Sequence, residues 1–136
     1  TFGYDVLGRL ATIEDARTRT LTYDARGRLD RIVTSDGVSQ IYGWDGSLLS
    51  SVTVAGPFSH RIDQTYDNFF RPLVTTIDGG SPVAQAYDLD GVVSSVGGLA
   101  VTRGTTGLVK STTASSITDA FTYNPYGEII GHAVTG

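Results

Sequence analysis

Two kinds of side chain in this sequence could do chemistry: the two histidines and a recurring set of aspartates. His60 and His132 are the only histidines, and the chain has no cysteine. Neither histidine lies in a His-x-His or Glu-x-x-His pattern, so a tetrahedral zinc site would need an unusual ligand set. We therefore expect both histidines to be surface or strand residues, and we predict no metal site and no cofactor.

The aspartates recur along the chain, at Asp5, Asp24, Asp67 and Asp88. General acid–base catalysis needs two carboxylates close together in different environments, whereas a repeat places its copies in equivalent environments one unit apart. The run 88–91 resembles the start of a calcium loop but lacks the third oxygen ligand and the distal glutamate. We expect a turn there, with Asp88 binding its own backbone. No nucleophile elbow or phosphate-binding glycine loop occurs, so we predict no enzyme.

The aspartates belong to a repeated phrase, Tyr-Asp-x-x-Gly-Arg-Leu, which is clearest at 4–10 and 23–29. Self-similarity at intervals of about 20 residues indicates a repeat architecture. We predict a single array over 1–136, with about seven units beginning near Tyr4, Tyr23, Tyr42, Tyr66, Tyr87, Arg103 and Tyr123. The predicted structural motif residues are Tyr4, Asp5, Gly8, Tyr23, Asp24, Gly27, Tyr42, Gly46, Tyr66, Asp67, Tyr87, Asp88, Gly91, Tyr123 and Gly127.

Each phrase predicts one β-hairpin. The tyrosine ends the incoming strand, the aspartate begins a type I turn, and the glycine supplies the positive φ that closes the loop. Between the turns, runs such as 19–23 alternate with period two, and no segment has a sustained helical pattern. The sequence therefore predicts an all-β fold of repeated antiparallel hairpins, with the phrase leucines facing a core.

The copy at Tyr66 departs from the phrase. Phe70 stands at the glycine position, where a bulky residue at positive φ costs about 1 kcal/mol or more. We therefore expect that loop to take another conformation. Pro72 follows closely and has no amide donor, which predicts an edge or a bulge and makes this copy the expected site of irregular pairing.

Composition excludes several classes of protein. The net charge of −4 opposes nucleic-acid binding, which needs a cationic stripe. No apolar stretch approaches the ~20 residues that cross a bilayer as a helix, so we predict no membrane span. With 40% hydrophobic and 18% charged residues the chain should fold around a core, and with no initiator methionine we expect it to be a piece of a longer polypeptide.

The phrase, most clearly at 4–10 and 23–29, resembles the YD or Rhs repeats of bacterial Rhs and wall-associated proteins, insecticidal toxin-complex subunits and animal teneurins. This resemblance implies a sheet that spirals into a hollow shell or barrel. The last copy, at 123–130, is similar to the variant that precedes the Rhs core, a region that closes the shell and in many members releases an enclosed toxin. Neither that core nor a toxin lies within these residues, so their activities do not carry over.

We predict a non-catalytic shell segment whose partner is the rest of the shell or an enclosed toxin polypeptide, in a secreted or cell-surface protein. The alternative is an extracellular adhesion or carbohydrate-binding module, in which Tyr23, Trp44 and Tyr87 stack on glycans. Packing between repeats accounts for the same rings. Edge strands with unpaired backbone groups tend to pair with other chains. In the isolated chain we therefore expect either self-association through edge strands or a sheet that folds back on itself.

Overall fold

A computed structural model describes residues 1–136, which form fourteen β-strands and no helix, and therefore contain no helix that could span a membrane. The strands are β1 (Phe2–Tyr4), β2 (Leu10–Glu14), β3 (Thr18–Tyr23), β4 (Leu29–Thr34), β5 (Ser39–Asp45), β6 (Leu48–Ala55), β7 (His60–Tyr66), β8 (Pro72–Ile77), β9 (Val83–Tyr87), β10 (Val93–Val96), β11 (Leu99–Arg103), β12 (Val109–Ala114), β13 (Ile117–Tyr123) and β14 (Ile129–Thr135).

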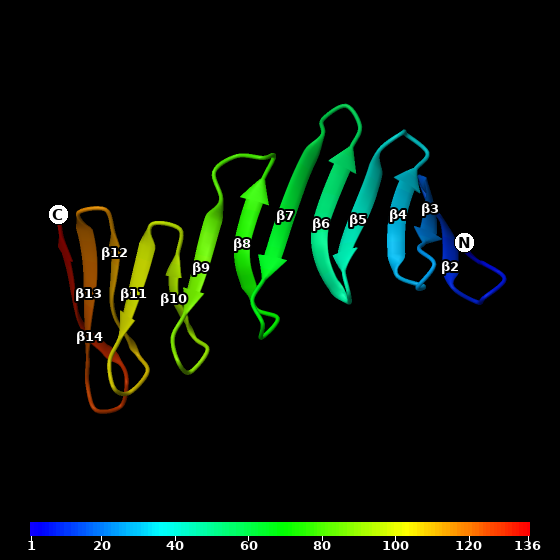
Figure 1. Ribbon diagram of the computed structural model, residues 1–136. Coiled ribbons are helices and arrows are strands. Elements are labelled where there is room, and N and C mark those ends of the chain that lie inside the picture. The colour runs from blue at the N-terminus through cyan, green and yellow to red at the C-terminus, as the bar shows by residue number, and fades with distance from the viewer. The chain divides into compact units, whose positions relative to one another are not determined.

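Strand order follows chain order, so each strand lies beside its neighbours in the sequence (Figure 1). The chain divides into two compact units, Thr1–Pro82 and Val83–Gly136. Antiparallel ladders join β1 to β8 in the first unit and β9 to β14 in the second. The predicted all-β fold of antiparallel hairpins is confirmed.

The phrase marks the hairpin loops as expected, and each of these loops adjoins a β-bulge. In the hairpin of β3 and β4, Thr22 pairs with Arg31 and Tyr23 pairs with Leu29, so Asp30 is an extra residue on the return strand. Equivalent shifts lie beside the other phrase loops. One bulge is therefore built into each repeat. Each bulge bends its strand and increases the local twist.

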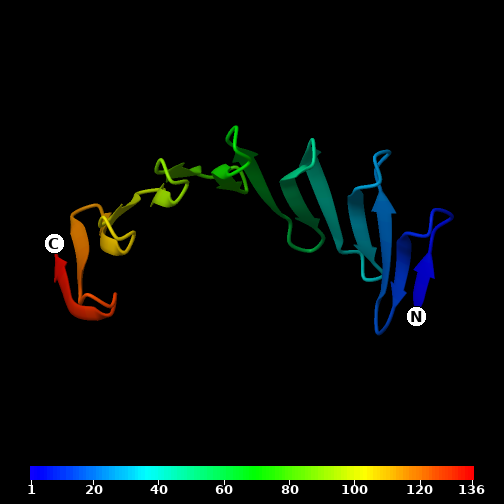
Figure 2. The same ribbon diagram turned by 90° about the horizontal axis from the view of Figure 1, so that it is seen from below.

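Each unit is one layer of strands, with no helix and no second sheet against it (Figures 1 and 2). Cross-strand partners share a face, so the registers assign residues to two sides. One side, here called the aromatic face, carries Tyr4, Leu21, Tyr23, Ile32, Trp44, Ile62 and Tyr66 in the first unit and Tyr87, Leu99, Val101, Phe121 and Tyr123 in the second. The opposite side is mostly Thr, Ser, Ala and Gly.

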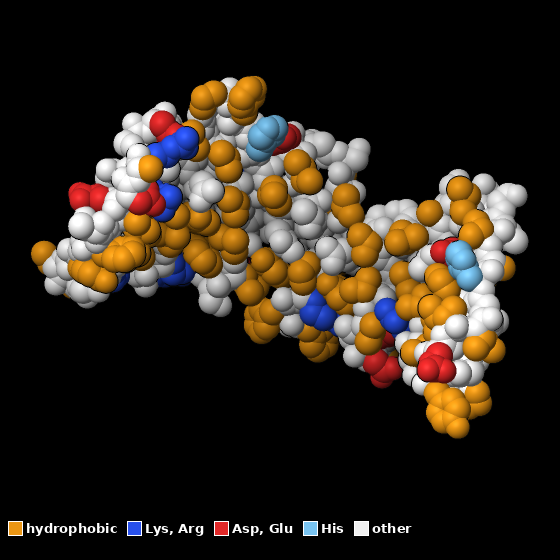
Figure 3. Space-filling view, turned by 180° about the vertical axis from the view of Figure 1, so that it is seen from behind, with side chains coloured by type: hydrophobic (Ala, Val, Ile, Leu, Met, Phe, Trp, Pro, Cys, Tyr) orange, Lys and Arg blue, Asp and Glu red, His pale blue; other side chains and the backbone are white.

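The predicted hydrophobic core is absent, which corrects the sequence expectation. No hydrophobic side chain is fully buried, and Ser51 is the most enclosed residue. The phrase leucines Leu10 and Leu29 are half-buried, while Ile62 and Ile77 remain 45% and 57% exposed. Hydrophobic side chains accordingly gather on the surface in both units (Figure 3). A single layer has nothing to cover its apolar side, which explains why 40% hydrophobic residues give no core.

The loop after Tyr66 also differs from expectation. Phe70 adopts φ 63° and takes the place of glycine in the same turn, with its amide 3.0 Å from the Asp67 carbonyl oxygen. The bulge predicted near Pro72 exists, at Thr65 and Tyr66, but the other phrase hairpins have the same irregularity. The Tyr66 copy therefore follows the same pairing pattern as the other copies. Its loop differs only in holding a bulky residue in a strained backbone conformation.

Candidate functional site

The hairpin loops are built around the phrase aspartate. In the loop 24–28, Asp24 Oδ1 accepts the amides of Arg26 and Arg28 at 2.8 and 2.9 Å. The second carboxylate oxygen accepts Arg28 Nε at 2.7 Å. Gly27, at φ 80°, donates its amide to the Asp24 carbonyl oxygen at 3.0 Å. One carboxylate thus satisfies two loop amides and fixes the arginine side chain just before the return strand.

The same arrangement recurs with small changes. Asp5 and Asp67 each accept two loop amides and the Nε of an arginine four residues on. Asp88 accepts the amides of Asp90 and Val92, as the turn interpretation of 88–91 predicted. Asn124 accepts two amides through its side-chain oxygen and donates Nδ2 to Glu128 at 2.6 Å. The amide side chain of Asn124 therefore builds the same loop, and here the carboxylate belongs to Glu128 instead.

The loops hold their carboxyl groups in the ionised form. The amide of Arg28, with smaller contributions from its guanidinium, lowers the pKa of Asp24, and the equivalent bonds from Arg9 lower the pKa of Asp5. For Asp67, desolvation is the largest single effect and acts upward, but the hydrogen bonds from Arg71 and Phe69 outweigh it, so this pKa is also lowered. All three loops therefore favour the ionised form of their carboxyl group.

This preference predicts a loss of stability in acid. Because the folded pKa lies below the unfolded one, the contribution of these loops is complete above about pH 5 and is lost as the pH falls through the folded values, below about pH 4. We expect the thermal midpoint, measured by circular dichroism, to fall steeply between pH 4 and pH 2. The triple variant Asp5→Asn, Asp24→Asn, Asp67→Asn keeps the amide acceptors, as Asn124 does, and should show a flatter profile. An unchanged profile in the triple variant would contradict the assignment.

A second set of hydrogen bonds links four of the repeats to the one before. Tyr23 Oη donates to the Leu10 carbonyl oxygen at 2.8 Å, Tyr66 Oη to that of Leu49 at 2.7 Å, and Tyr123 Oη to that of Val109 at 2.7 Å. Each acceptor residue is the cross-strand partner of the residue at the tyrosine position of the preceding hairpin. That residue is aromatic in two cases and an arginine in the third. The aromatic side chains of the phrase therefore act between repeats.

The third repeat uses Trp44 in this role, two residues after the expected origin at Tyr42. Trp44 Nε1 donates to the Leu29 carbonyl oxygen at 2.9 Å and Trp44 pairs with Leu49, whereas Tyr42 Oη reaches only the Gln40 side chain. The hairpin loop is one residue shorter here, with Gly46 at φ 58°. Because indole and phenol both present one polar donor at the end of a ring, either can make the link.

The phrase arginines, whose role the sequence did not reveal, lie over rings. The guanidinium carbon of Arg9 lies 4.4 Å from the centroid of Tyr23, and that of Arg28 lies 5.4 Å from Trp44. Arg71 lies 5.1 Å from Phe69 in its own loop. Tyr23 and Trp44, two of the rings considered for glycan stacking, therefore each have a guanidinium over one face, and Tyr87 Oη bonds the Gln85 side chain. Glycan stacking at these three rings stays a prediction.

The histidines form exposed pairs with aspartates. His60 Nδ1 lies 2.7 Å from Asp78 Oδ2, and His132 Nε2 lies 2.5 Å from Asp119 Oδ1, with the His132 ring stacked on Phe121. The hydrogen bond to His60 lowers the pKa of Asp78. Neither histidine is hydrogen bonded to a hydroxyl group, and no three His, Asp or Glu side chains gather as metal ligands. These pairs tie neighbouring strands together.

Comparison with known proteins supports the resemblance seen in the sequence. Residues 4–39 match the RHS repeat family. A search of curated proteins finds no match. Among solved structures, the chain is similar to one described as TcdB2-TccC3-TEV, with a TM-score of 0.70 and 18% identity over 98% of this chain. The chain spans 9% of the length of that structure's chain, so the match concerns the fold of a segment.

Proposed function

We propose, starting from the RHS repeat segment at residues 4–39, that this chain is a non-catalytic wall segment of a β-shell that encloses or presents a polypeptide. The enclosed polypeptide would be a C-terminal toxin or a comparable cargo. Such a shell would belong to a secreted or cell-surface protein, and its action would be steric. A continuous hydrogen-bonded wall keeps the cargo from solvent and proteases without any catalytic group.

The observation that carries this proposal is the single-layer sheet without a buried core. A wall has two accessible sides. In this single layer, every strand places alternate side chains on each of the two sides. A globular domain would instead bury its apolar face against a second layer. The aromatic face, with Ile62 and Ile77 about half exposed, is a surface that further parts of a shell or a cargo would cover.

The hydrogen bonds between repeats support the same proposal. Main-chain ladders hold the strands of each unit together, and the links from Tyr23, Trp44, Tyr66 and Tyr123 add one side-chain bond across the loops. These bonds run in the direction in which the array grows. They resist opening between neighbouring hairpins, which is what a protective wall requires.

Limited proteolysis of the full-length parent protein tests the proposal. We expect the region that follows this segment to resist a protease in the intact protein and to be digested after Gly27→Val and Trp44→Ala open the wall. Phe70→Gly, which keeps the same loop, is the matched control and should leave protection intact. Electron microscopy of the parent should show a hollow shell. A solid or extended rod, or equal digestion before and after the two substitutions, would refute the proposal.

A further inference from the structure

The loop pair 104–107 and 124–127 lacks the guanidinium that lies over Tyr23. Leu108 stands at the position of Arg9, since each gives its carbonyl oxygen to the first amide of its loop. A Cβ added at Gly27 would lie 3.8 Å from Arg9 Nη1, and one added at Gly127 would lie 3.6 Å from Leu108 Cδ1. The two environments are therefore equivalent, with a leucine where the earlier repeat has an arginine.

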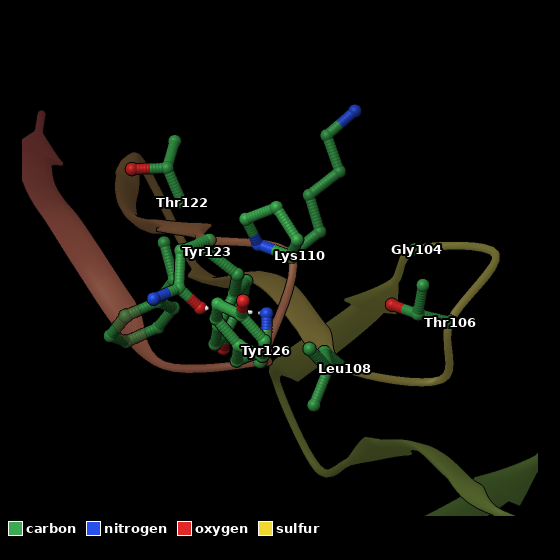
Figure 4. A pocket seen from close by; sticks show the side chains of 11 residues that line it. Gly104, Thr106, Leu108, Lys110, Thr122, Tyr123 and Tyr126 are labelled. Carbon is green, nitrogen blue, oxygen red and sulfur yellow. Dashed lines mark hydrogen bonds between the residues drawn. The ribbon is translucent and has the colours of Figure 1, made fainter.

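A cavity of about 590 Å³ lies beside these two loops. It is lined by Leu108, Thr106 and Gly104 on one side and by Tyr123, Tyr126 and Pro125 on the other. In Figure 4, Thr106 and Leu108 lie across the cavity from Tyr126, and the long side chain of Lys110 extends away from the rings. Gly104, in place of the phrase aspartate, removes a second side chain from the same region.

We propose that this cavity binds an arginine side chain supplied by a partner polypeptide. Tyrosine rings line the cavity, and they resemble the rings that Arg9 and Arg28 cover. A guanidinium stacks on a tyrosine face better than an ammonium does. Arg28 Nη1 also donates to the carbonyl oxygen of Gly46 in the following loop. The carbonyl groups of the loop 124–127 offer equivalent acceptors to an incoming guanidinium.

Charges of both signs lie around the cavity, and Arg103 Nη1 donates to the Gly107 carbonyl oxygen at 3.3 Å in the loop on one side of it. Glu128 binds Asn124 Nδ2 at 2.6 Å, and Asn124 lines the cavity, so a carboxylate lies one side chain away. Lys110 is the one cation among the lining residues, and its ammonium group points outward in Figure 4. The chain as a whole carries a net charge of −4. None of these features depends on the shell proposal, because the site needs only the two loops.

Nuclear magnetic resonance of the labelled 136-residue chain tests this site with capped Gly-Arg-Gly as the probe. We expect saturable shifts of the Leu108 methyl groups and of the Tyr123 and Tyr126 rings. Capped Gly-Lys-Gly should bind more weakly, by up to about fivefold, the factor that a whole exposed cation–π contact is worth. Methyl glucoside, which tests for a sugar site, should cause no saturable shift.

Two variants keep the test decisive. The double variant Gly104→Asp, Leu108→Arg rebuilds the loop of Asp24 and Arg28, fills the cavity and should abolish binding; a Cβ at Gly104 would meet only Thr106 Oγ1, at 3.9 Å. Tyr126→Ala removes a ring that is 89% exposed, so the sheet should persist while binding weakens. Absence of saturable shifts, equal binding of the two peptides, a preference for the glucoside, or undiminished binding by the double variant would overturn the proposal.

Discussion

Replacing Trp44 by alanine should destabilise the chain by about 2–4 kcal/mol, the cost of removing a large half-buried ring together with its hydrogen bond and its cation–π contact. Trp44 donates to the Leu29 carbonyl oxygen and lies under the guanidinium of Arg28. Urea denaturation followed by circular dichroism measures the loss. Because small domains have only about 5–15 kcal/mol of stability, this substitution should remove a large part of it.

Conservative substitutions separate the link between repeats from the size of the ring. Trp44→Tyr keeps a donor and a ring at the position and should recover most of the stability. Tyr23→Phe removes the bond to the Leu10 carbonyl oxygen and should cost about 0.5–1.5 kcal/mol. Tyr42→Phe removes only a contact with the Gln40 side chain and should cost less. A larger loss for Tyr42→Phe than for Tyr23→Phe would return the repeat origin to Tyr42.

Gly27→Val should destabilise the chain by about 2 kcal/mol, because a β-branched residue is forced to positive φ. Gly27 has φ 80°, and an added Cβ would meet only Arg9 Nη1 at 3.8 Å, so the cost comes from the backbone and not from a clash. The same urea experiment measures it. A loss below that of an ordinary surface substitution, about 0.5 kcal/mol, would show that the loop adopts another turn.

Phe70 provides the reverse experiment at the equivalent position. Phe70→Gly relieves the strain at φ 63° and removes a ring that is 72% exposed, so it should stabilise the chain by up to about 1 kcal/mol after the entropy cost of glycine. Destabilisation would mean that the Phe70 ring contributes packing that outweighs its backbone strain.

The phrase predicted the loops well because its information is local. Asp24 and Gly27 act within five residues of each other, and the turn they form needs nothing else from the chain. The same locality explains the strand ends at Tyr23 and Tyr66. The prediction at Phe70 was wrong because the surrounding ladder and the Asp67 bonds hold the turn in place against an unfavourable residue.

Features that join different repeats could not be found from the phrase alone. The links from Tyr23 to Leu10 and from Trp44 to Leu29 span 13 and 15 residues, and the role of Trp44 depends on a shortened loop. The missing core has a similar cause, because composition reports how much apolar surface exists but not whether a second layer covers it. A search for an aromatic residue followed directly by aspartate would have identified Trp44-Asp45 as the third origin.

The hydrogen bonds between repeats also constrain how such a chain can change in length. In each of these bonds, donor and acceptor come from adjacent hairpins. Adding or removing one complete hairpin therefore leaves each remaining donor beside an acceptor of the same kind. Inserting or deleting one residue inside a strand would instead turn the aromatic side chains to the other face and break the bonds on both sides. The array is therefore free to evolve by whole units, and its length can change without redesigning any single repeat.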